Sequence, residues 1–154
     1  ISEKKRIYVY GKGSSGLAAL EMKLRFMRIG VTIEAITDVD IMKMNSVLLD
    51  GECAAIGISV SGRTEAVIHS LQSAKKCGAA VILMTSHIEK KFQNFCDEIM
   101  LFAVKANLEK GKAISPQFPI LVMVDIIYSR MLRMDDFRRE TLHEYTLEVL
   151  ERDS

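Results

Sequence analysis

The 154-residue chain has little cysteine, little proline and no long hydrophobic run. Its three cysteines, Cys53, Cys77 and Cys96, are an odd number, lie far apart in the sequence and form no CxxC pair. This pattern excludes a disulfide framework and a cysteine metal site, and it predicts buried thiols in a reducing, cytoplasmic compartment. No apolar stretch approaches the roughly 18 residues that a membrane span needs, and no signal peptide is visible.

An excess of charge of one sign is also missing. The chain has 21 Lys and Arg against 20 Asp and Glu, which is a formal net charge of +1. A balance of this kind indicates neither a basic surface for binding nucleic acid nor an acidic tail. The three histidines, at positions 69, 87 and 143, form no ligand cluster, so we expect no metal and no cofactor. The length and the 49% hydrophobic share are typical of one globular domain.

Short apolar runs predict five strands in the first two thirds of the chain. They cover Arg6–Tyr10, Val31–Ile36, Cys53–Val60, Ala80–Thr85 and Glu98–Val104. Most of these runs are continuous rather than alternating, which is typical of parallel strands that are buried on both faces. The only prolines, Pro116 and Pro119, follow the last of these runs.

Helical spacing of apolar residues predicts helices between and after these strands. The expected helices cover Ser15–Ile29, Glu65–Cys77, Ile120–Leu132 and Asp136–Glu151. The first two are each followed by a glycine, Gly30 and Gly78, which suits a left-handed cap. Strands that alternate with helices indicate an α/β fold, a three-layer α/β/α sandwich. Its five-stranded parallel sheet is expected in the flavodoxin-like order 2-1-3-4-5.

A glycine-rich turn, Gly11–Gly16, follows the first strand and opens the first helix with the sequence GKGSSG. Such a turn exposes backbone amides and a positive helix end, and both suit an anion. The spacing also satisfies GxGxxG, so a dinucleotide site stays open as an alternative. That alternative requires an acidic residue about twenty positions further on, for which Glu34 and Asp38 are the candidates.

A hydroxyl-rich loop, Ser59–Thr64 with the sequence SVSGRT, follows the third strand and leads into the next helix. Three hydroxyls around a glycine can surround the terminal oxygens of a phosphate monoester, whereas a pyrophosphate requires bare glycine. The hydroxyls could instead only cap the helix, although one hydroxyl is enough for a cap. Since the first and third strands are neighbours at the switch point, both loops are expected to face one crevice. The sequence therefore favours a small phosphorylated ligand.

These two loops resemble the sugar isomerase (SIS) domain family, in which the SxSGxT loop holds a sugar phosphate. The resemblance extends over roughly residues 5 to 135 and includes Arg6–Tyr10 as the first strand. Three further segments resemble the C-terminal domain of RpiR-type transcriptional regulators, namely Met27–Gly30 and the late Ala113–Ser115 and Val124–Tyr128.

The resemblance implies a phosphosugar site made from both loops and one late serine. The expected ligand-binding residues are Gly13, Ser14, Ser15, Ser59, Ser61, Gly62, Arg63, Thr64 and Ser115. Side-chain hydroxyls and the amides of Gly62 and Arg63 would grip the phosphate. Arg63 replaces an acidic or amide residue of the family, so it would either add a charge contact or point to solvent.

Two functions from different classes stay open, a sensor of a sugar phosphate and an aldose–ketose isomerase. Isomerisation needs a general base over C1 and C2 of the sugar. Glu65, His87, Glu109 and Lys112 follow strands at the expected edge, but they have no spacing signature. We therefore expect no catalytic residue and favour the sensor, and Glu65 is equally explained by complementing the helix dipole.

The resemblance also implies partners. It predicts a homo-oligomer, a dimer or a tetramer, with ligand contacts at subunit boundaries and no membrane contact. The chain opens at Ile1 without an initiator Met and reaches its first strand at once. We therefore expect residues 1–154 to be a single SIS domain that is preceded, in a longer protein, by a helix-turn-helix domain. Only that absent domain would contact DNA.

Overall fold

The middle layer of the protein is a parallel sheet. The computed structural model describes residues 4–103, 117–134 and 138–152. The sheet has the order β2-β1-β3-β4-β5, and all neighbouring strands are parallel. The strands are β1 Arg6–Gly11, β2 Ile33–Ile36, β3 Cys53–Ile58, β4 Ala80–Thr85 and β5 Glu98–Leu101. The predicted sheet and its strand order are confirmed.

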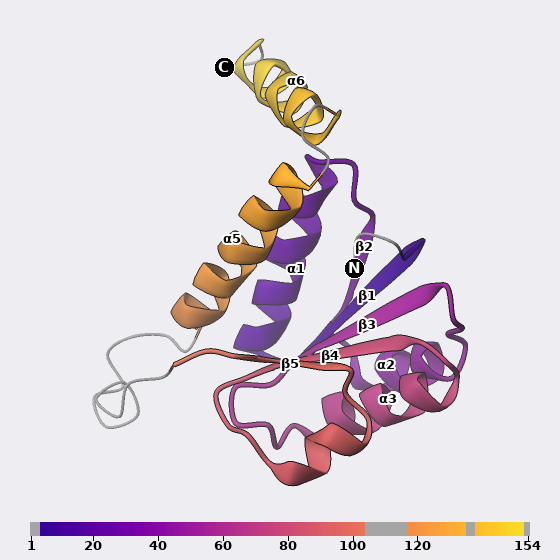
Figure 1. The fold of residues 1–154 in the computed structure, drawn as a ribbon. Coiled ribbons are helices and arrows are strands. Elements are labelled where there is room, and N and C mark those ends of the chain that lie inside the picture. The colour runs from indigo at the N-terminus through magenta and orange to yellow at the C-terminus, as the bar shows by residue number, and fades with distance from the viewer. Residues whose placement is uncertain (1–3, 104–116, 135–137, 153–154) are drawn as a thin grey trace.

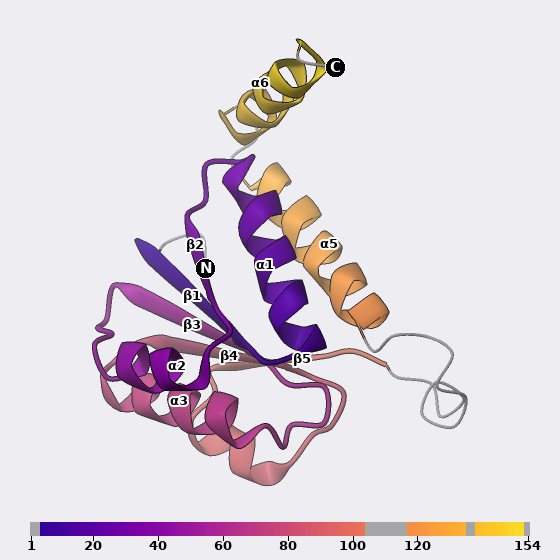
Figure 2. The same ribbon diagram turned by 180° about the vertical axis from the view of Figure 1, so that it is seen from behind.

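Helices cover both faces of the sheet. Helices α1 (Ser14–Met27) and α5 (Gln117–Arg133) pack side by side on one face, and α2 (Val39–Ser46) and α3 (Glu65–Lys76) cover the other (Figures 1 and 2). A short 3₁₀ helix, η1 (Lys90–Asn94), precedes β5. Helix α6 (Arg138–Arg152) extends beyond the sheet from the end of α5 (Figure 1). The predicted three-layer α/β/α sandwich is therefore confirmed.

The alternation of side chains along β3 explains why its sequence is apolar throughout. Ala54, Ile56 and Ile58 enter the core beneath α1 and α5. Cys53 and Ala55 enter the core beneath α2 and α3. Because successive residues of a strand point to opposite faces, a central strand between two helical layers needs an apolar residue at every position.

Several predicted boundaries are wrong by a few residues. Strand β2 begins at Ile33 rather than Val31, and β3 ends at Ile58, so Ser59 and Val60 belong to the following loop. Strand β5 ends at Leu101 and is only partly buried, as an edge strand. Helix α5 starts before the predicted Ile120. The predicted ends at residues 104 and 136 lie outside the described residues.

Helices α2 and η1 escaped the sequence prediction because both are short and carry few periodic apolar residues. Helix α2 nevertheless has an N-cap residue in its sequence, Asp38. The Asp38 side chain accepts hydrogen bonds from the backbone amides of Asp40 at 3.0 Å and Ile41 at 2.9 Å. The predicted left-handed caps are confirmed, with φ of 72° at Gly30 and 90° at Gly78.

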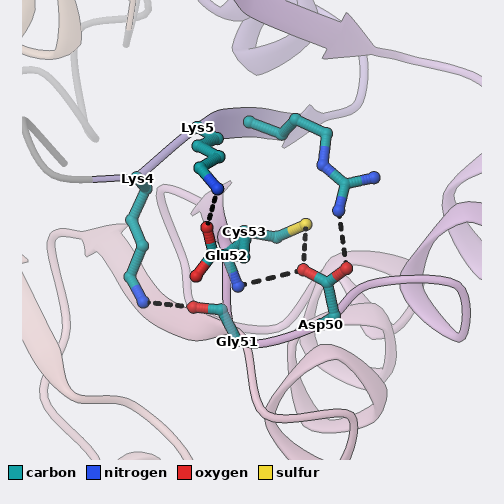
Figure 3. A network of polar contacts seen from close by, with 7 residues as sticks. Lys4, Lys5, Asp50, Gly51, Glu52 and Cys53 are labelled. Atoms are coloured by element: carbon teal, nitrogen blue, oxygen red, sulfur yellow. Dashed lines mark hydrogen bonds and ion pairs between the residues drawn. The ribbon is translucent and has the colours of Figure 1, made fainter.

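A polar network joins the chain start to the turn before β3, at the amino ends of the strands (Figure 3). It consists of Lys4, Lys5, Arg6, Asp50, Gly51, Glu52 and Cys53. The Asp50 carboxylate accepts a hydrogen bond from the Cys53 thiol at 3.2 Å and forms an ion pair with Arg6 at 2.6 Å. Both contacts lower the pKa of Asp50 below its usual value, and the hydrogen bond from the Cys53 thiol makes the largest contribution. The network lies at the edge of the sheet opposite the two predicted loops.

The three cysteines are free thiols, but the predicted burial is correct for only one of them. Cys53 is buried, whereas Cys77 and Cys96 are half-buried. Burial raises the pKa of the Cys96 thiol to about 12, so that side chain stays protonated at neutral pH.

Candidate functional site

The two loops that the sequence singled out leave the sheet side by side. Gly11, the last residue of β1, is the register partner of Ile58, the last residue of β3. The loops Gly11–Gly16 and Ser59–Thr64 therefore start from neighbouring carboxyl ends of parallel strands. This is the edge at which open α/β sheets bind their ligands.

The glycines of the first loop permit a close approach of α1 to β1. A Cβ on Gly11 would lie 2.5 Å from the carbonyl oxygen of Ser15, and one on Gly16 would lie 2.9 Å from the carbonyl oxygen of Gly11. Gly13, the N-cap of α1, has a φ of 59°, a conformation that favours glycine. The GxGxxG spacing is thus explained by packing within this turn.

The N-terminus of α1 has no side-chain cap. The amides of Gly16 and Leu17 donate to the carbonyl of Gly13 at 2.9 and 3.2 Å. The amides of Ser14 and Ser15 come before these and have no intrahelical acceptor. Ser15 is buried and Ser14 half-buried, and neither hydroxyl has a hydrogen-bond partner within the described part of the chain.

The hydroxyls of the second loop bond partly to one another. The Ser59 hydroxyl accepts the amide of Thr64 at 3.3 Å and donates to the Thr64 hydroxyl at 3.0 Å. Ser61 accepts the amide of Arg63 at 3.3 Å. Ser59 is only 1% exposed, so it stabilises the loop from within, whereas Thr64 is half-buried and Ser61 is exposed.

Gly62 allows the second loop to fold tightly over the sheet. Its φ is 67°, and a Cβ there would lie 2.8 Å from the Phe92 ring and 3.3 Å from the Thr85 hydroxyl. The Gly62 amide donates to the carbonyl of Ser59 at 3.0 Å. Gly62 therefore shapes the loop, and its amide is already bonded within it.

Thr64 is the N-cap of α3, but its side chain makes no capping hydrogen bond. The Ile68 amide is bonded to the carbonyl of Thr64 at 3.0 Å. The three amides before Ile68 therefore have no intrahelical acceptor. Because Ser59 donates to the Thr64 hydroxyl, that hydroxyl keeps its own proton for another acceptor. The helix-capping alternative thus accounts for none of the three hydroxyls, because Ser59 and Ser61 bond to amides that precede the helix and Thr64 makes no capping bond.

A third segment, Thr85–His87 at the end of β4, lies against the second loop, and the sequence analysis singled out only its His87. The amide and the hydroxyl of Ser86 donate to the carbonyl of Val60 at 3.0 and 2.7 Å, and the Thr85 hydroxyl donates to it at 3.2 Å. The signal was present, because Thr-Ser-His directly follows an apolar strand. These contacts place His87, which is exposed, at the same edge as both predicted loops.

Arg63 and His87 both act electrostatically on Glu89. The pKa of Glu89 is lowered, first by a hydrogen bond from Lys91 and also by the charges of Arg63 and His87. Lys91 lies 2.6 Å from the Glu89 carboxylate. Arg63 itself is exposed and takes part in none of the ion pairs found within the described residues.

The structure brings Gly13, Ser14, Ser15, Ser59, Ser61, Gly62, Arg63 and Thr64 to one edge of the sheet. The predicted Ser115, and the candidates Glu109 and Lys112, lie outside the described residues. Glu65 is exposed in the first turn of α3, as its helix-dipole explanation expects.

The two candidates for the acidic residue of a dinucleotide site have other partners. Asp38 caps α2, and Glu34 pairs with Lys23 at 3.1 Å. In the described ranges, no group of three or more His, Cys, Asp or Glu side chains lies together as a metal site. None of the helices in those ranges has the length and hydropathy that a bilayer crossing requires.

The fold and the paired loops define a doubly wound α/β domain that presents two uncapped helix N-termini and several hydroxyls at one sheet edge. The chain belongs to the SIS domain family, whose family model matches residues 1–124. This confirms the family that the two loops indicated.

Curated relatives include both regulators and an enzyme. An HTH-type transcriptional regulator of Haemophilus influenzae is 27% identical over 150 residues, which is 97% of this chain and 52% of the relative. The HTH-type transcriptional regulator RpiR of Escherichia coli is 27% identical over 82% of this chain and 43% of its own. A 3-hexulose-6-phosphate isomerase of Mycobacterium gastri is 26% identical over 73% and 54%. The chain spans about half the length of these relatives.

Solved structures have the same fold. Vibrio vulnificus NanR complexed with ManNAc-6P superposes with a TM-score of 0.86 and 21% identity, covering 100% of this chain and 58% of that one. The sugar isomerase domain of an RpiR transcription factor from Sphaerobacter thermophilus superposes with a TM-score of 0.77 and 15% identity, covering 99% and 81%. The E. coli CFT073 protein c3406, in complex with a sugar phosphate, superposes with a TM-score of 0.77 and 24% identity, covering 94% and 78%.

Proposed function

We propose that residues 1–154 form the sugar-phosphate-sensing domain of a bacterial RpiR-type transcriptional regulator. The observation that carries the proposal is the register pairing of Gly11 with Ile58, from which two loops with uncapped helix N-termini leave side by side. The regulator relatives support the transcriptional role. Since the chain spans about half of their length, an attached helix-turn-helix domain is part of the proposal.

The phosphate is proposed to lie between the N-termini of α1 and α3. The amides of Ser14 and Ser15 on one side, and the first-turn amides of α3 on the other, point their partial positive charge to this edge. The hydroxyls of Ser61 and Thr64 would donate to the phosphate oxygens, and Arg63 would add a positive charge. Each charge-assisted hydrogen bond contributes about 1.5–3 kcal/mol.

The bound state is proposed to pass to DNA through the assembly. A homo-oligomer, a dimer or a tetramer, would have two arrangements of its subunits, and a ligand at the subunit boundary would favour one of them. Only a difference in affinity between the two arrangements produces such a switch. Ser115 would complete the ligand wall. A regulator of this kind acts in the bacterial cytoplasm, where free thiols such as Cys77 stay reduced.

The proposal predicts phosphate-dependent binding. In calorimetric titrations with ManNAc-6P, arabinose 5-phosphate, fructose 6-phosphate and glucosamine 6-phosphate, we expect at least one to bind. Its dephosphorylated sugar should bind at least about a hundredfold more weakly, since two lost charge-assisted bonds exceed 2.7 kcal/mol. Equal affinity for a sugar with and without phosphate, or no binding by any of the four, would contradict the proposal.

The second candidate function is sugar-phosphate isomerisation, which the Mycobacterium gastri relative favours. His87 lies at the same edge of the sheet, and its Nδ1 atom is 2.9 Å from the Ser86 hydroxyl. We expect no conversion of fructose 6-phosphate, glucosamine 6-phosphate or sedoheptulose 7-phosphate, followed by proton NMR. Turnover of any of them that His87→Asn abolishes would replace the sensor with the enzyme.

A further inference from the structure

The outer surface of α1 and α5 is apolar along both helices. On α1, Leu17, Leu24 and Met27 are each more than half exposed. On α5, Phe118 and Ile126 are also more than half exposed. Side chains three, four or seven positions apart lie on one side of a helix, so each helix presents an apolar stripe away from the sheet. We call this surface the α1/α5 face.

The α1/α5 face is also basic. The ion pair of Arg25 with Asp125 links the two helices. Beside it, Arg28, Arg130 and Arg133 have no carboxylate within salt-bridge distance in the part of the chain that the structure describes. A hollow of about 360 Å³ on α5 is lined by Val122, Asp125, Ile126, Ser129, Arg130 and Arg133. A surface hollow that is lined by two aliphatic side chains and two arginines suits an apolar segment that carries acidic residues.

The first half of α6 packs against its own subunit. The hydroxyl of Tyr128 and Nδ1 of His143 are 2.7 Å apart, and Arg139 donates to the carbonyl of Met131 at 2.8 Å. Leu142 lies so close to Gly30 that a Cβ there would be 2.9 Å away. These contacts hold α6 to the end of α5.

The second half of α6 has the opposite character to the α1/α5 face. Residues 144–152, the second half of α6, contain three glutamates and one arginine, Arg152, so this half is acidic. Tyr145, Leu147 and Val149 are exposed, and Tyr145 is 62% exposed. This half extends beyond the sheet and its covering helices (Figures 1 and 2). Glu151 lies in the last turn of α6, where a negative charge opposes the helix macrodipole.

From this complementarity we propose that two copies of the chain exchange their α6 helices. The second half of α6 of one copy binds the hollow on α5 of the other, with Tyr145 and Val149 over Val122 and Ile126. Glu144 and Glu151 of that helix face Arg130 and Arg133. The contact is isologous, so a two-fold dimer forms it twice and leaves neither helix nor groove unpaired. It specifies the interface of the proposed oligomer and requires no sugar phosphate.

Charge reversal tests the exchange in sedimentation experiments on the whole chain without ligand. The groove variant is Arg130→Glu with Arg133→Glu, and the helix variant is Glu144→Arg with Glu151→Arg. We expect the wild type to dimerise and each variant alone to dissociate at least tenfold more readily, because like charges then meet at both contacts. An equimolar mixture of the two variants should dimerise again, since both contacts of the mixed dimer pair opposite charges. Circular dichroism checks that each variant is folded.

Every other result counts against the exchange. A helix variant that stays dimeric would show that the α1/α5 faces pair with each other instead. A monomeric wild type, or a mixture that stays monomeric, would also overturn it. The matched control, Lys76→Glu with Lys90→Glu on the opposite side of the sheet, should dimerise like the wild type. Because no ligand is present, none of these results depends on whether the phosphate site is correctly assigned.

Discussion

Replacement of Gly11 with alanine is expected to lower the free energy of unfolding by about 3 kcal/mol, which belongs to the large end of single-substitution effects. The added Cβ would lie 2.5 Å from the carbonyl oxygen of Ser15 and 2.7 Å from its carbonyl carbon. Both are backbone atoms of the first turn of α1, so no side-chain rotation relieves the clash. Helix α1 would have to move away from β1 and open the core beneath it. Urea unfolding followed by circular dichroism measures the loss.

Gly51→Ala is the matched control for this prediction. Gly51 is exposed, has no left-handed φ, and a Cβ there would have no heavy atom within 4 Å. Its effect should stay within about 0.5 kcal/mol, as is usual for surface substitutions. Equal losses of unfolding free energy in the two variants would show that the close approach of α1 to β1 does not require glycine at position 11.

Thr64→Val is expected to weaken the binding of a sugar phosphate by about tenfold or more, and Ser61→Ala should have a similar effect. Valine keeps the β-branched shape of Thr64 but removes the hydroxyl that receives the Ser59 proton. The lost donor corresponds to about 1.4 kcal/mol, which is one decade in the dissociation constant. Calorimetry with the sugar phosphate that binds the wild type provides the measurement.

Thr32→Val makes the same chemical change elsewhere. Thr32 is exposed just before β2, at the amino edge of the sheet, so the affinity should not change. The free energy of unfolding of each variant shows whether the loop still folds, because Thr64→Val also removes the bond to Ser59. Unchanged affinity in both Thr64→Val and Ser61→Ala would remove the hydroxyl-rich loop from the phosphate site.

Local sequence was sufficient to predict the sheet and the loops that lead from it. A fully apolar β3 can only be a central strand, because both of its faces must be covered. Gly11, Gly13 and Gly16 predicted a tight strand-to-helix turn. In the structure a Cβ would clash at Gly11 and Gly16, and Gly13 has a left-handed backbone conformation. Family resemblance then predicted the SIS domain, which the family model confirms.

The different structural roles of the three hydroxyls in the hydroxyl-rich loop could not be predicted from sequence. Ser59, Ser61 and Thr64 look alike in the motif, yet Ser59 is buried as an internal support while Ser61 is exposed. The contribution of Thr85 and Ser86 was also hidden, because their partner is the carbonyl of Val60, far away in the sequence. Backbone carbonyls carry no side-chain signature, so such contacts appear only when strands are placed next to one another.

The amino-acid sequence by itself determined the layers and the two loops, because these depend on hydrophobic period and on glycine and hydroxyl positions along one segment. The strand order followed from the fold type that the alternation of strands and helices indicated. Tertiary structure decided which side of each helix is covered. Helix α5 is apolar on both sides, and only its packing against α1 and the sheet buries Val124 and leaves Ile126 exposed. The arginines of the α1/α5 face that have no ion pair among the described residues, and the acidic second half of α6, became visible in the same way. Burial and charge complementarity between distant segments are properties of the folded chain, not of any one segment.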